Sequence, residues 1–459
     1  MIKRGRPAGV GQSRAMPGPR PRYLGQLLVT LATDKLAFFA DMARCGDVTQ
    51  TQIGPQRIVL LNHPDDIRRV LVTEQRKFTK GRALERTKLL LGTGLLTSEG
   101  EFHLRQRRLV QPGLHRERLL GYGRVMVELA ERMLGKWSNG EVLDVHEQMM
   151  HLTLSVAGRT LFDVDVEQDA HEVGEALDLS LRLFQYTVLP LGGLLEYAPV
   201  PWIRQLHRSR RQLDALITRM ITERRREGGD RGDLLSMLIA AQDPEGNHEG
   251  MTDRQLRDEI VTLLMAGHET TANALTWTCY LLAQHPEIAA RLEAEVDAVL
   301  GGRAPSPEDA PKLVYTRNVI AEGMRLYPPA WIVERLAQEP FEAGGYRIDP
   351  GTIVYTSQYL VHHDPRWWPA PARFVPERWA DEAAAASRPK FAYFPFGGGT
   401  RICVGEHFAW LEATLVLAAI AQRWRMIYEE PLPPEPEALV TLRPKGGLRL
   451  RLERRVAAR

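Results

Sequence analysis

Residues 396–405 read Phe-Gly-Gly-Gly-Thr-Arg-Ile-Cys-Val-Gly, and this stretch is the most informative part of the sequence. Its three consecutive glycines permit a backbone too tight for residues with a Cβ atom, and Arg401 adds a fixed positive charge. Cys403 stands just before a predicted helix from about Glu406 to Trp424. Helix-start N–H groups and a nearby cation lower the pKa of a cysteine, and the thiolate is the form that binds metals. The stretch therefore predicts a ligating thiolate.

The cysteines of the chain are Cys45, Cys279 and Cys403, which lie far apart and form no CxxC or CxxH pair. They predict no disulfide framework, zinc site or iron–sulfur cluster, and they suit a reducing compartment. One sulfur cannot complete a metal site, so a ligating Cys403 implies a cofactor that supplies the remaining ligands, as haem does. The alternative for Cys403 is an inert buried thiol beside a Gly-rich turn.

The pattern FxxGxRxCxG resembles the haem-binding signature of the cytochrome P450 superfamily, and it is formed by Phe396, Gly399, Arg401, Cys403 and Gly405. Five fixed positions, one of them a rare Cys, match by chance below about once in a million starting points. The resemblance, to soluble bacterial-type haem–thiolate monooxygenases, extends over nearly the whole chain. It implies haem b (iron protoporphyrin) with Cys403 as axial thiolate. It also implies a mainly α fold with small β-sheets (α+β) and a long central helix over the haem.

The long helix is visible in the sequence itself. From Asp253 to Gln284 about 30 residues contain no proline, which predicts a helix of ~45 Å with Thr252 as its N-cap. Hydrophobic periodicity predicts further helices at 35–44, 119–136, 145–161, 203–226, 286–300 and 311–326, and strands at 48–53, 57–61 and 346–357.

Residues 266–271 of this helix, Ala-Gly-His-Glu-Thr-Thr, resemble the oxygen-activation motif of the family. Ala266 and Thr270 share a helical face, and Gly267 permits close approach of a ligand. The resemblance implies that Glu269 and Thr270 are catalytic and deliver protons. Taken alone, the residues favour another interpretation, in which Thr270 bonds its own i−4 carbonyl and Glu269 is solvated.

Further cofactor-binding residues follow from the resemblance. The two propionate groups of haem are carboxylates, which need cations where water is excluded. The residues that the resemblance implies as their partners are Arg401, His103, Arg107 and Arg335, and the alternative for Arg335 is a surface position. Arg105 and Arg108 project from other faces of the same predicted helix. They are candidates for docking an acidic ferredoxin, against the alternative of a solvated helix face.

A second motif serves the architecture. Glu322 and Arg325 resemble the ExxR pair of the family, and Arg378 resembles the arginine that completes it. Spacing of i, i+3 lets the first two pair on one helix. His362, His363 and Asp364 are adjacent, point in different directions and lack a second cluster, so we expect a loop and no metal site there.

The domain organisation is simple. No Pro/Gly/Ser-rich linker divides the interior, which predicts one haem–thiolate monooxygenase domain over residues 23–459. Residues 1–22 are predicted to be a disordered tail that carries basic residues and no acids. Because the formal net charge is only +3 and the excess lies in that tail, no nucleic-acid partner is expected. The basic start lacks an apolar export segment, and residues 24–40 are broken by charges, so we expect no transmembrane anchor and a cytoplasmic location.

The predicted reaction inserts one oxygen atom from O₂ into a C–H bond of a small lipophilic substrate, such as a fatty acid, terpenoid or carotenoid. Candidate pocket residues are nearly all apolar: Leu90, Leu95, Phe184, Leu263, Ala266, Ala330, Trp331 and Ile332. No nucleotide-binding signature occurs, so separate ferredoxin and ferredoxin-reductase proteins are expected to supply the electrons. Two alternatives remain: a peroxide-driven haem peroxygenase, which would lack the acid–alcohol pair, and a non-catalytic haem sensor or carrier.

Overall fold

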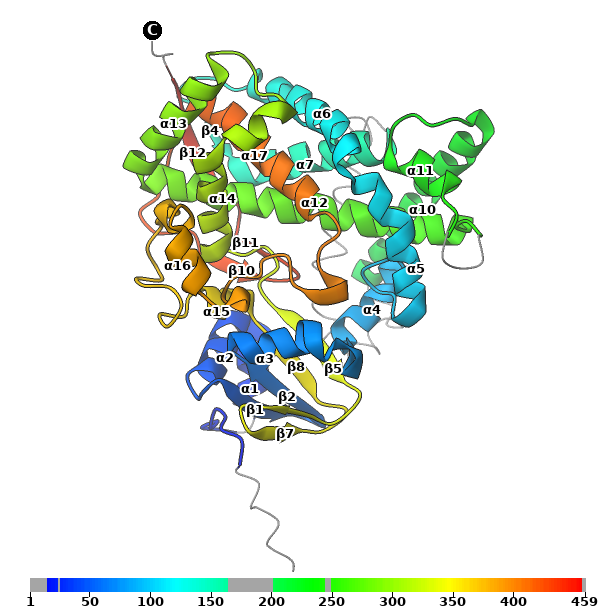
Figure 1. The fold of residues 1–459 in the computed structure, drawn as a ribbon, viewed down its shortest axis with the longest axis vertical. Helices are drawn as coiled ribbons and strands as arrows, with labels where there is room; N and C mark the ends of the chain where they lie inside the picture. The colour runs from blue at the N-terminus through cyan, green and yellow to red at the C-terminus, as the bar shows by residue number, and fades with distance from the viewer. Residues whose placement is uncertain (1–14, 24, 164–200, 244–248, 456–459) are drawn as a thin grey trace, which may run out of the picture.

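The computed structural model describes residues 15–23, 25–163, 201–243 and 249–455, and Figure 1 shows the arrangement of their elements. Over these residues helices dominate and the sheets are small. The predicted mainly α class with small sheets is confirmed. In Figure 1 the largest sheet and the first helices lie at one end, and the long helices fill the rest.

The central helix α12 spans Asp253–Gln284, which are the predicted bounds. It begins with a capping box: Thr252 Oγ1 accepts from Gln255 N at 3.3 Å, and Gln255 Oε1 accepts from Thr252 N at 2.9 Å. It packs most extensively against α7 (Val145–Phe162) and crosses the middle of the molecule (Figure 1). Most of its side chains are buried, so α12 is the axis on which the other long helices pack.

The remaining helices have the following bounds: α1 Gln26–Thr33, α2 Lys35–Ala43, α3 Pro64–Arg68, α4 Arg82–Leu91, α5 Gly100–Val110, α6 Arg116–Leu134, α10 Pro201–Glu227, α11 Leu234–Ala240, α13 Pro286–Leu300, α14 Val314–Leu326, α15 Gln358–His362, α16 Glu382–Ser387 and α17 Glu406–Arg423. The predicted helix at 286–300 is confirmed. The helix predicted from 311 begins instead at Val314, because Pro307–Lys312 form a 3₁₀ turn containing a second proline, Pro311.

The strands are short: β1 Val48–Ile53, β2 Gln56–Leu61, β3 Phe78–Lys80, β4 Val142–Asp144, β5 Val333–Ala337, β6 Phe341–Ala343, β7 Tyr346–Ile348, β8 Ile353–Thr356, β9 Trp424–Ile427, β10 Pro436–Ala438, β11 Leu442–Pro444 and β12 Arg449–Arg454. The largest sheet has the order β1-β2-β8-β5-β3, in which only β2 and β8 are parallel. The others are β4-β12-β9, β10-β11 and β6-β7.

Two sequence predictions need correction. The strand predicted over 346–357 is wrong, because it is divided into β7 and β8 by a turn in which Gly351 has φ +82°. Residues 16–18, assigned to the tail, lie on β1. Gln50 N donates to Pro17 O at 2.8 Å, and a Cβ on Gly18 would lie 1.8 Å from Gln50 O. The ordered chain therefore starts before residue 23.

The predicted ExxR network is present, and its Glu322–Arg325 pair is fully buried. Arg325 donates to Glu322 through Nε at 2.9 Å and Nη2 at 2.8 Å, and both side chains are 0% exposed. Arg378 Nε and Trp379 Nε1 complete the carboxylate at 3.3 and 3.1 Å. Arg325 also donates to the carbonyls of His362, Pro371 and Arg373 at 2.7–3.0 Å, so one guanidinium fastens the chain after α15 to α14.

Replacing Glu322 with Gln should lower the free energy of unfolding by about 3 to 5 kcal/mol, because it leaves the Arg325 charge buried without a counter-charge. Urea unfolding followed by circular dichroism measures the effect. Arg291→Gln, which breaks an ion pair between the exposed Arg291 and Glu377, is the control and should cost at most about 1 kcal/mol. An equal cost for the two variants would contradict the assigned role.

Candidate functional site

The loop before α17 is shaped by its glycines. Gly397 and Gly399 have φ of +76° and +68°, and a Cβ on Gly399 would lie 2.0 Å from Leu71 O. Cys403 N donates to Phe396 O at 2.9 Å, which closes the loop. Phe396 itself packs against Trp410 of α17, with ring centroids 5.9 Å apart. Local chain geometry thus fixes where the Cys403 sulfur lies.

The Cys403 side chain is exposed although α17 behind it is largely buried. Burial by surrounding protein nevertheless raises the pKa of the thiol, against the lowering effects of the Gly405 N–H and the Arg107 charge. The predicted lowering of the pKa by the helix start is therefore outweighed by desolvation, and a bound metal cation would have to favour the thiolate. Gly405, with φ −90°, needs no left-handed backbone.

Cations gather beside this loop. Arg401 pairs with Glu99 and donates to Ser98 O at 2.8 Å, and Lys80 Nζ donates to the same carbonyl at 2.9 Å. Burial, together with the charges of Arg401 and Arg335, lowers the pKa of Lys80 to about 7, although Glu99 opposes this. Burial and the Arg401 charge likewise lower the pKa of Arg335 to about 10. The cluster holds more positive charge than its own carboxylates balance.

His103 and Arg107 occupy the α5 face that the resemblance implied. His103 is buried, and burial with the charges of Arg401, Lys80 and Arg107 lowers the pKa of its imidazole to about 3, so the ring is neutral. Arg107 Nη1 donates to Ile402 O at 2.7 Å, one residue before Cys403. Arg107 thus supports the loop directly, and His103 faces the cation cluster.

The two predicted catalytic side chains point in different directions. Adjacent residues of a helix lie about 100° apart, and Thr270 Oγ1 donates to Ala266 O at 2.8 Å, as the alternative interpretation expected. Glu269 is buried and accepts from Thr441 Oγ1 at 2.6 Å, so its expected solvation is wrong. Asn273 Nδ2 donates to the same hydroxyl at 3.0 Å. The acid is thereby held by the β10–β11 hairpin.

Ala266 is exposed on α12, one turn before Thr270, as expected for a residue that faces a bound group. Gly267 corrects a prediction: its missing Cβ would lie 3.9 Å from Ala157 of α7, so it faces a helix and not a ligand.

The predicted pocket residues divide. Leu95 and Leu263 belong to the main core cluster with α12, both 8% exposed. Trp331 is a correction: it lies in a separate cluster with Phe39 and donates to Leu439 O at 3.1 Å, so it packs under α2. Ala330 is half-buried and Ile332 packs on that second cluster. Phe184 and the Leu90 side chain lie outside the described residues.

Arg105 and Arg108, the candidate docking residues, are used within the chain. Arg105 Nη2 donates to the carbonyls of Glu249 and Gly250 at 2.9 Å, and Arg108 forms a bidentate pair with buried Asp243 at 3.0 and 3.1 Å. These contacts anchor the chain on both sides of residues 244–248. The docking prediction for these two arginines is therefore not supported.

Sequence reasoning missed several site residues. Lys80 and Thr441 carry no local signal, because only tertiary contacts bring them to Arg401 and Glu269. Glu412 had a signal: it directly precedes the uncharged run 413–421 of α17. It is 0% exposed, and burial raises its pKa well above the usual range. The expected loop at 362–364 is partly wrong, because His362 is the last residue of α15; its Nε2 accepts from Phe394 N at 3.1 Å. Within the described ranges no group of three His, Cys, Asp or Glu could hold a metal ion.

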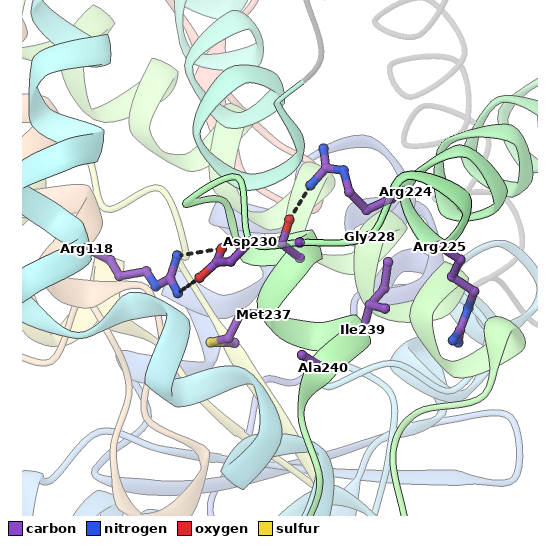
Figure 2. A pocket seen from close by; sticks show the side chains of 10 residues that line it. Arg118, Arg224, Arg225, Gly228, Asp230, Met237, Ile239 and Ala240 are labelled. Carbon is purple, nitrogen blue, oxygen red and sulfur yellow. Dashed lines mark hydrogen bonds and ion pairs between the residues drawn. The ribbon is translucent and has the colours of Figure 1, made fainter.

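A surface cavity of about 420 Å³ lies elsewhere, between α6, α10 and α11 (Figure 2). Its arginines already have partners: Arg118 Nη2 donates to Asp230 Oδ2 at 2.7 Å, and Arg224 pairs with Asp233. The cavity shares no lining residue with the site around Cys403. We therefore assign the chemistry to Cys403 and its neighbours.

Comparisons with known proteins agree. The family model for Cytochrome P450 matches residues 16–450. The chain is 41% identical over 421 residues to cyclooctatin synthase of Streptomyces melanosporofaciens (90% of this chain, 91% of that protein) and 36% identical over 424 residues to pentalenene oxygenase of Streptomyces avermitilis (92% and 93%). In fold it resembles the crystal structure of the cytochrome P450DA heme domain, with TM-score 0.87, 27% identity and coverage of 97% of this chain and 99% of the other.

The chain belongs to the cytochrome P450 family and is a cytochrome P450 monooxygenase, an enzyme class that uses a haem–thiolate cofactor and O₂. Its residues fit that cofactor. Cys403 is exposed just before α17, and Lys80, Arg335 and the Glu99-paired Arg401 form a cluster of cations that suits two propionate groups. No helix among the described residues is long and apolar enough to span a membrane.

Lys80→Met should release haem about ten to a hundred times faster than the wild type, because a charge-assisted hydrogen bond to a propionate is worth roughly 1.5–3 kcal/mol. Transfer of haem to excess apomyoglobin measures the rate. Lys77→Met, which removes a lysine paired with Glu74 three residues earlier, is the control and should leave the rate unchanged. Equal rates for both variants would remove Lys80 from the haem site.

Proposed function

We propose that the chain inserts one oxygen atom from O₂ into a C–H bond of a polycyclic terpenoid, with haem b bound through the Cys403 thiolate. The observation that supports the cofactor site most strongly is the exposed Cys403 side chain, which the Arg107 charge influences and whose loop also carries Arg401. When bound, the haem iron supplies the redox chemistry that divides O₂ between product and water.

Side chains and backbone groups of this chain bind the proposed cofactor. Cys403 donates electron density to the metal, and the Gly405 N–H and Arg107 stabilise the negative sulfur. Arg401, Arg335 and Lys80 balance the two propionates, and neutral His103 adds a hydrogen-bonding group without further charge. Phe396, Gly399 and Gly405 give the loop its shape, and Ala266 leaves room on α12.

Protons arrive through α12. The Thr270 hydroxyl lies on the face of Ala266, and because it already donates to the Ala266 carbonyl, its oxygen lone pairs remain available to accept a hydrogen bond from a water. Glu269 holds a proton-accepting carboxylate one residue away, kept in place by Thr441. A rotation of Glu269 away from Thr441, or one bridging water, would connect the two.

Two relatives point to the substrate class by their names, pentalenene oxygenase and cyclooctat-9-en-7-ol 5-monooxygenase, the second 39% identical to this chain. The endings of the two names denote an alkene and an unsaturated alcohol, so both compounds carry few polar groups. Leu95 and Leu263 suit such a molecule, because apolar side chains bind hydrocarbon surface by excluding water. Among the three predicted substrate classes, we therefore favour the terpenoid over a fatty acid or a carotenoid.

Electrons are proposed to come from separate proteins of the ferredoxin and ferredoxin-reductase type, because the sequence has no nucleotide-binding signature. Since Arg105 and Arg108 are already paired, the donor would have to use other residues near the Cys403 loop. The cytoplasmic location stays a prediction.

A ligand titration of the purified ferric protein tests the substrate proposal. Displacing water from the iron changes the spin state and the absorbance, and polycyclic terpene alcohols should do this at concentrations at least about tenfold below those of fatty acids of similar carbon number. A response to fatty acids alone would contradict the terpenoid proposal. A reduced carbon monoxide complex that absorbs like a histidine-bound globin would contradict the Cys403 ligand.

Thr270→Ala should reduce the product formed per pair of electrons at least about tenfold, because the oxygen that positions protons is lost. Thr276→Ala is the matched control: Thr276 is also on α12 and also donates to its i−4 carbonyl, at 2.7 Å, but is fully buried. Surrogate ferredoxin and reductase supply the electrons, and peroxide replaces them in a parallel assay. Unchanged behaviour of T270A would favour a sensor or carrier, and full turnover with peroxide alone would favour a peroxygenase.

A further inference from the structure

Residues 92–98 connect α4 to α5 and lie against two consecutive acids of α12, Asp258 and Glu259. These acids are 3% and 0% exposed, and the proposed reaction uses neither of them. Burying a carboxylate costs free energy unless hydrogen bonds replace its hydration. The donors that replace it here come largely from the connecting segment, so we asked what that arrangement does.

Asp258 holds the first half of the segment. Its Oδ2 accepts from Thr93 N at 2.8 Å and from Thr93 Oγ1 at 3.3 Å, and its Oδ1 accepts from Arg257 Nη1 at 3.0 Å. A Cβ on Gly92 would lie 2.1 Å from the Asp258 carboxylate. The chain therefore passes Asp258 so closely that residue 92 has no room for a side chain.

Glu259 holds Leu95 of the segment and Gln106 of α5. Its Oε2 accepts from Leu95 N at 3.0 Å, and with the Gln106 amide oriented to satisfy its neighbours, Oε1 accepts from that amide nitrogen at 3.1 Å. Burial raises the pKa of Glu259 to about 7, and Asp258 adds to this, while the Leu95 N–H and the Lys80 charge oppose it. The carboxyl group thus joins α12, α5 and the segment.

The opposite side of the segment is tied to the cation cluster. Lys80 Nζ donates to Leu95 O at 3.1 Å and to Ser98 O at 2.9 Å, and Arg401 Nη1 donates to Ser98 O at 2.8 Å. Thr97 Oγ1 closes the segment on itself by donating to Gly92 O at 2.7 Å. Residues 92–98 are therefore held between α12 and the cations beside Cys403.

Helical spacing shows what this position means for the site. Glu259, Leu263, Ala266 and Thr270 follow at steps of four, three and four, so they share one face of α12. The segment that Glu259 holds is thus placed on the face that carries exposed Ala266 and Thr270. Leu95, on the segment, and Leu263, on α12, belong to the same apolar cluster.

We propose that Asp258 and Glu259 are positioning residues that hold segment 92–98 as a wall of the substrate site and so set how long a hydrophobic ligand stays bound. The inference rests on the proposed function, because it concerns the same site. The two carboxylates act through the backbone N–H groups of Thr93 and Leu95, which they hold. If the segment is already held in place, less conformational entropy is lost when a ligand binds. Loosening the segment therefore weakens binding mainly through faster dissociation of the ligand.

Glu259→Leu separates positioning from stability. It removes both acceptors and leaves the Leu95 N–H and the Gln106 amide without them, at a cost of about 1–3 kcal/mol per buried group, so amides of α7 serve to report any general loss of stability. In the haem-loaded variant we expect the Leu95 amide, and to a lesser degree the Thr93 amide, to exchange hydrogen at least about tenfold faster, while α7 amides keep their wild-type rates. A long-chain alkyl imidazole, followed by its absorbance change on the iron, should dissociate about tenfold faster, and Glu259→Gln, which keeps one acceptor, should restore part of the difference.

Glu293→Gln is the control, because Glu293 is also a buried acid, 7% exposed, but pairs with Arg425 on β9. It should change neither rate. Unchanged exchange and unchanged dissociation in E259L would overturn the proposal, and so would an equal rise in exchange at α7, which would indicate general destabilisation. If the wild type bound no hydrophobic imidazole, the proposed function would fail, whereas the exchange measurement would still decide whether Glu259 holds the segment.

Discussion

The charge of Arg325, carried by a side chain with no exposed surface, is the constraint on which the site depends. Glu322 neutralises it, and the remaining N–H groups bind carbonyls of the chain after α15. His362 supplies one of these carbonyls and also accepts from Phe394 N, and Phe394 leads directly into the loop that Cys403 N closes on Phe396 O. A buried ion pair on α14 is thus connected by hydrogen bonds to the placement of the reactive sulfur.

Electrostatics gives the site its second constraint. Lys80, Arg335 and Arg401 are close enough that each lowers the pKa of a neighbour, and a buried cluster of like charges is costly in a medium of low dielectric. The dianionic cofactor of the proposed function would relieve this repulsion on binding. Burial, aided by the same charges, keeps His103 neutral.

Sequence reasoning succeeded where information is local. The bounds of α12 followed from its capping residue and a proline, and Cys403 and the Glu322–Arg325 pair followed from fixed spacings. It failed where distant segments meet. Lys80 reaches the cluster of cations only because β3 pairs with β5, which carries Arg335. Glu269 turns to a hydroxyl 172 residues later in the chain. Trp331 was misplaced because an apolar residue near a pocket and one in a neighbouring core look identical in sequence.

The contact between residues 16–18 and β1 has a practical consequence for work with this protein. Strand β1 is the outermost strand of its sheet, and Gln50 would present an unpaired N–H if Pro17 were missing. Open strand edges recruit other chains into intermolecular sheets. A shortened gene product that starts at residue 23, chosen to discard the basic extension, would lose this cover and become prone to self-association, whereas one that starts near residue 15 would keep it.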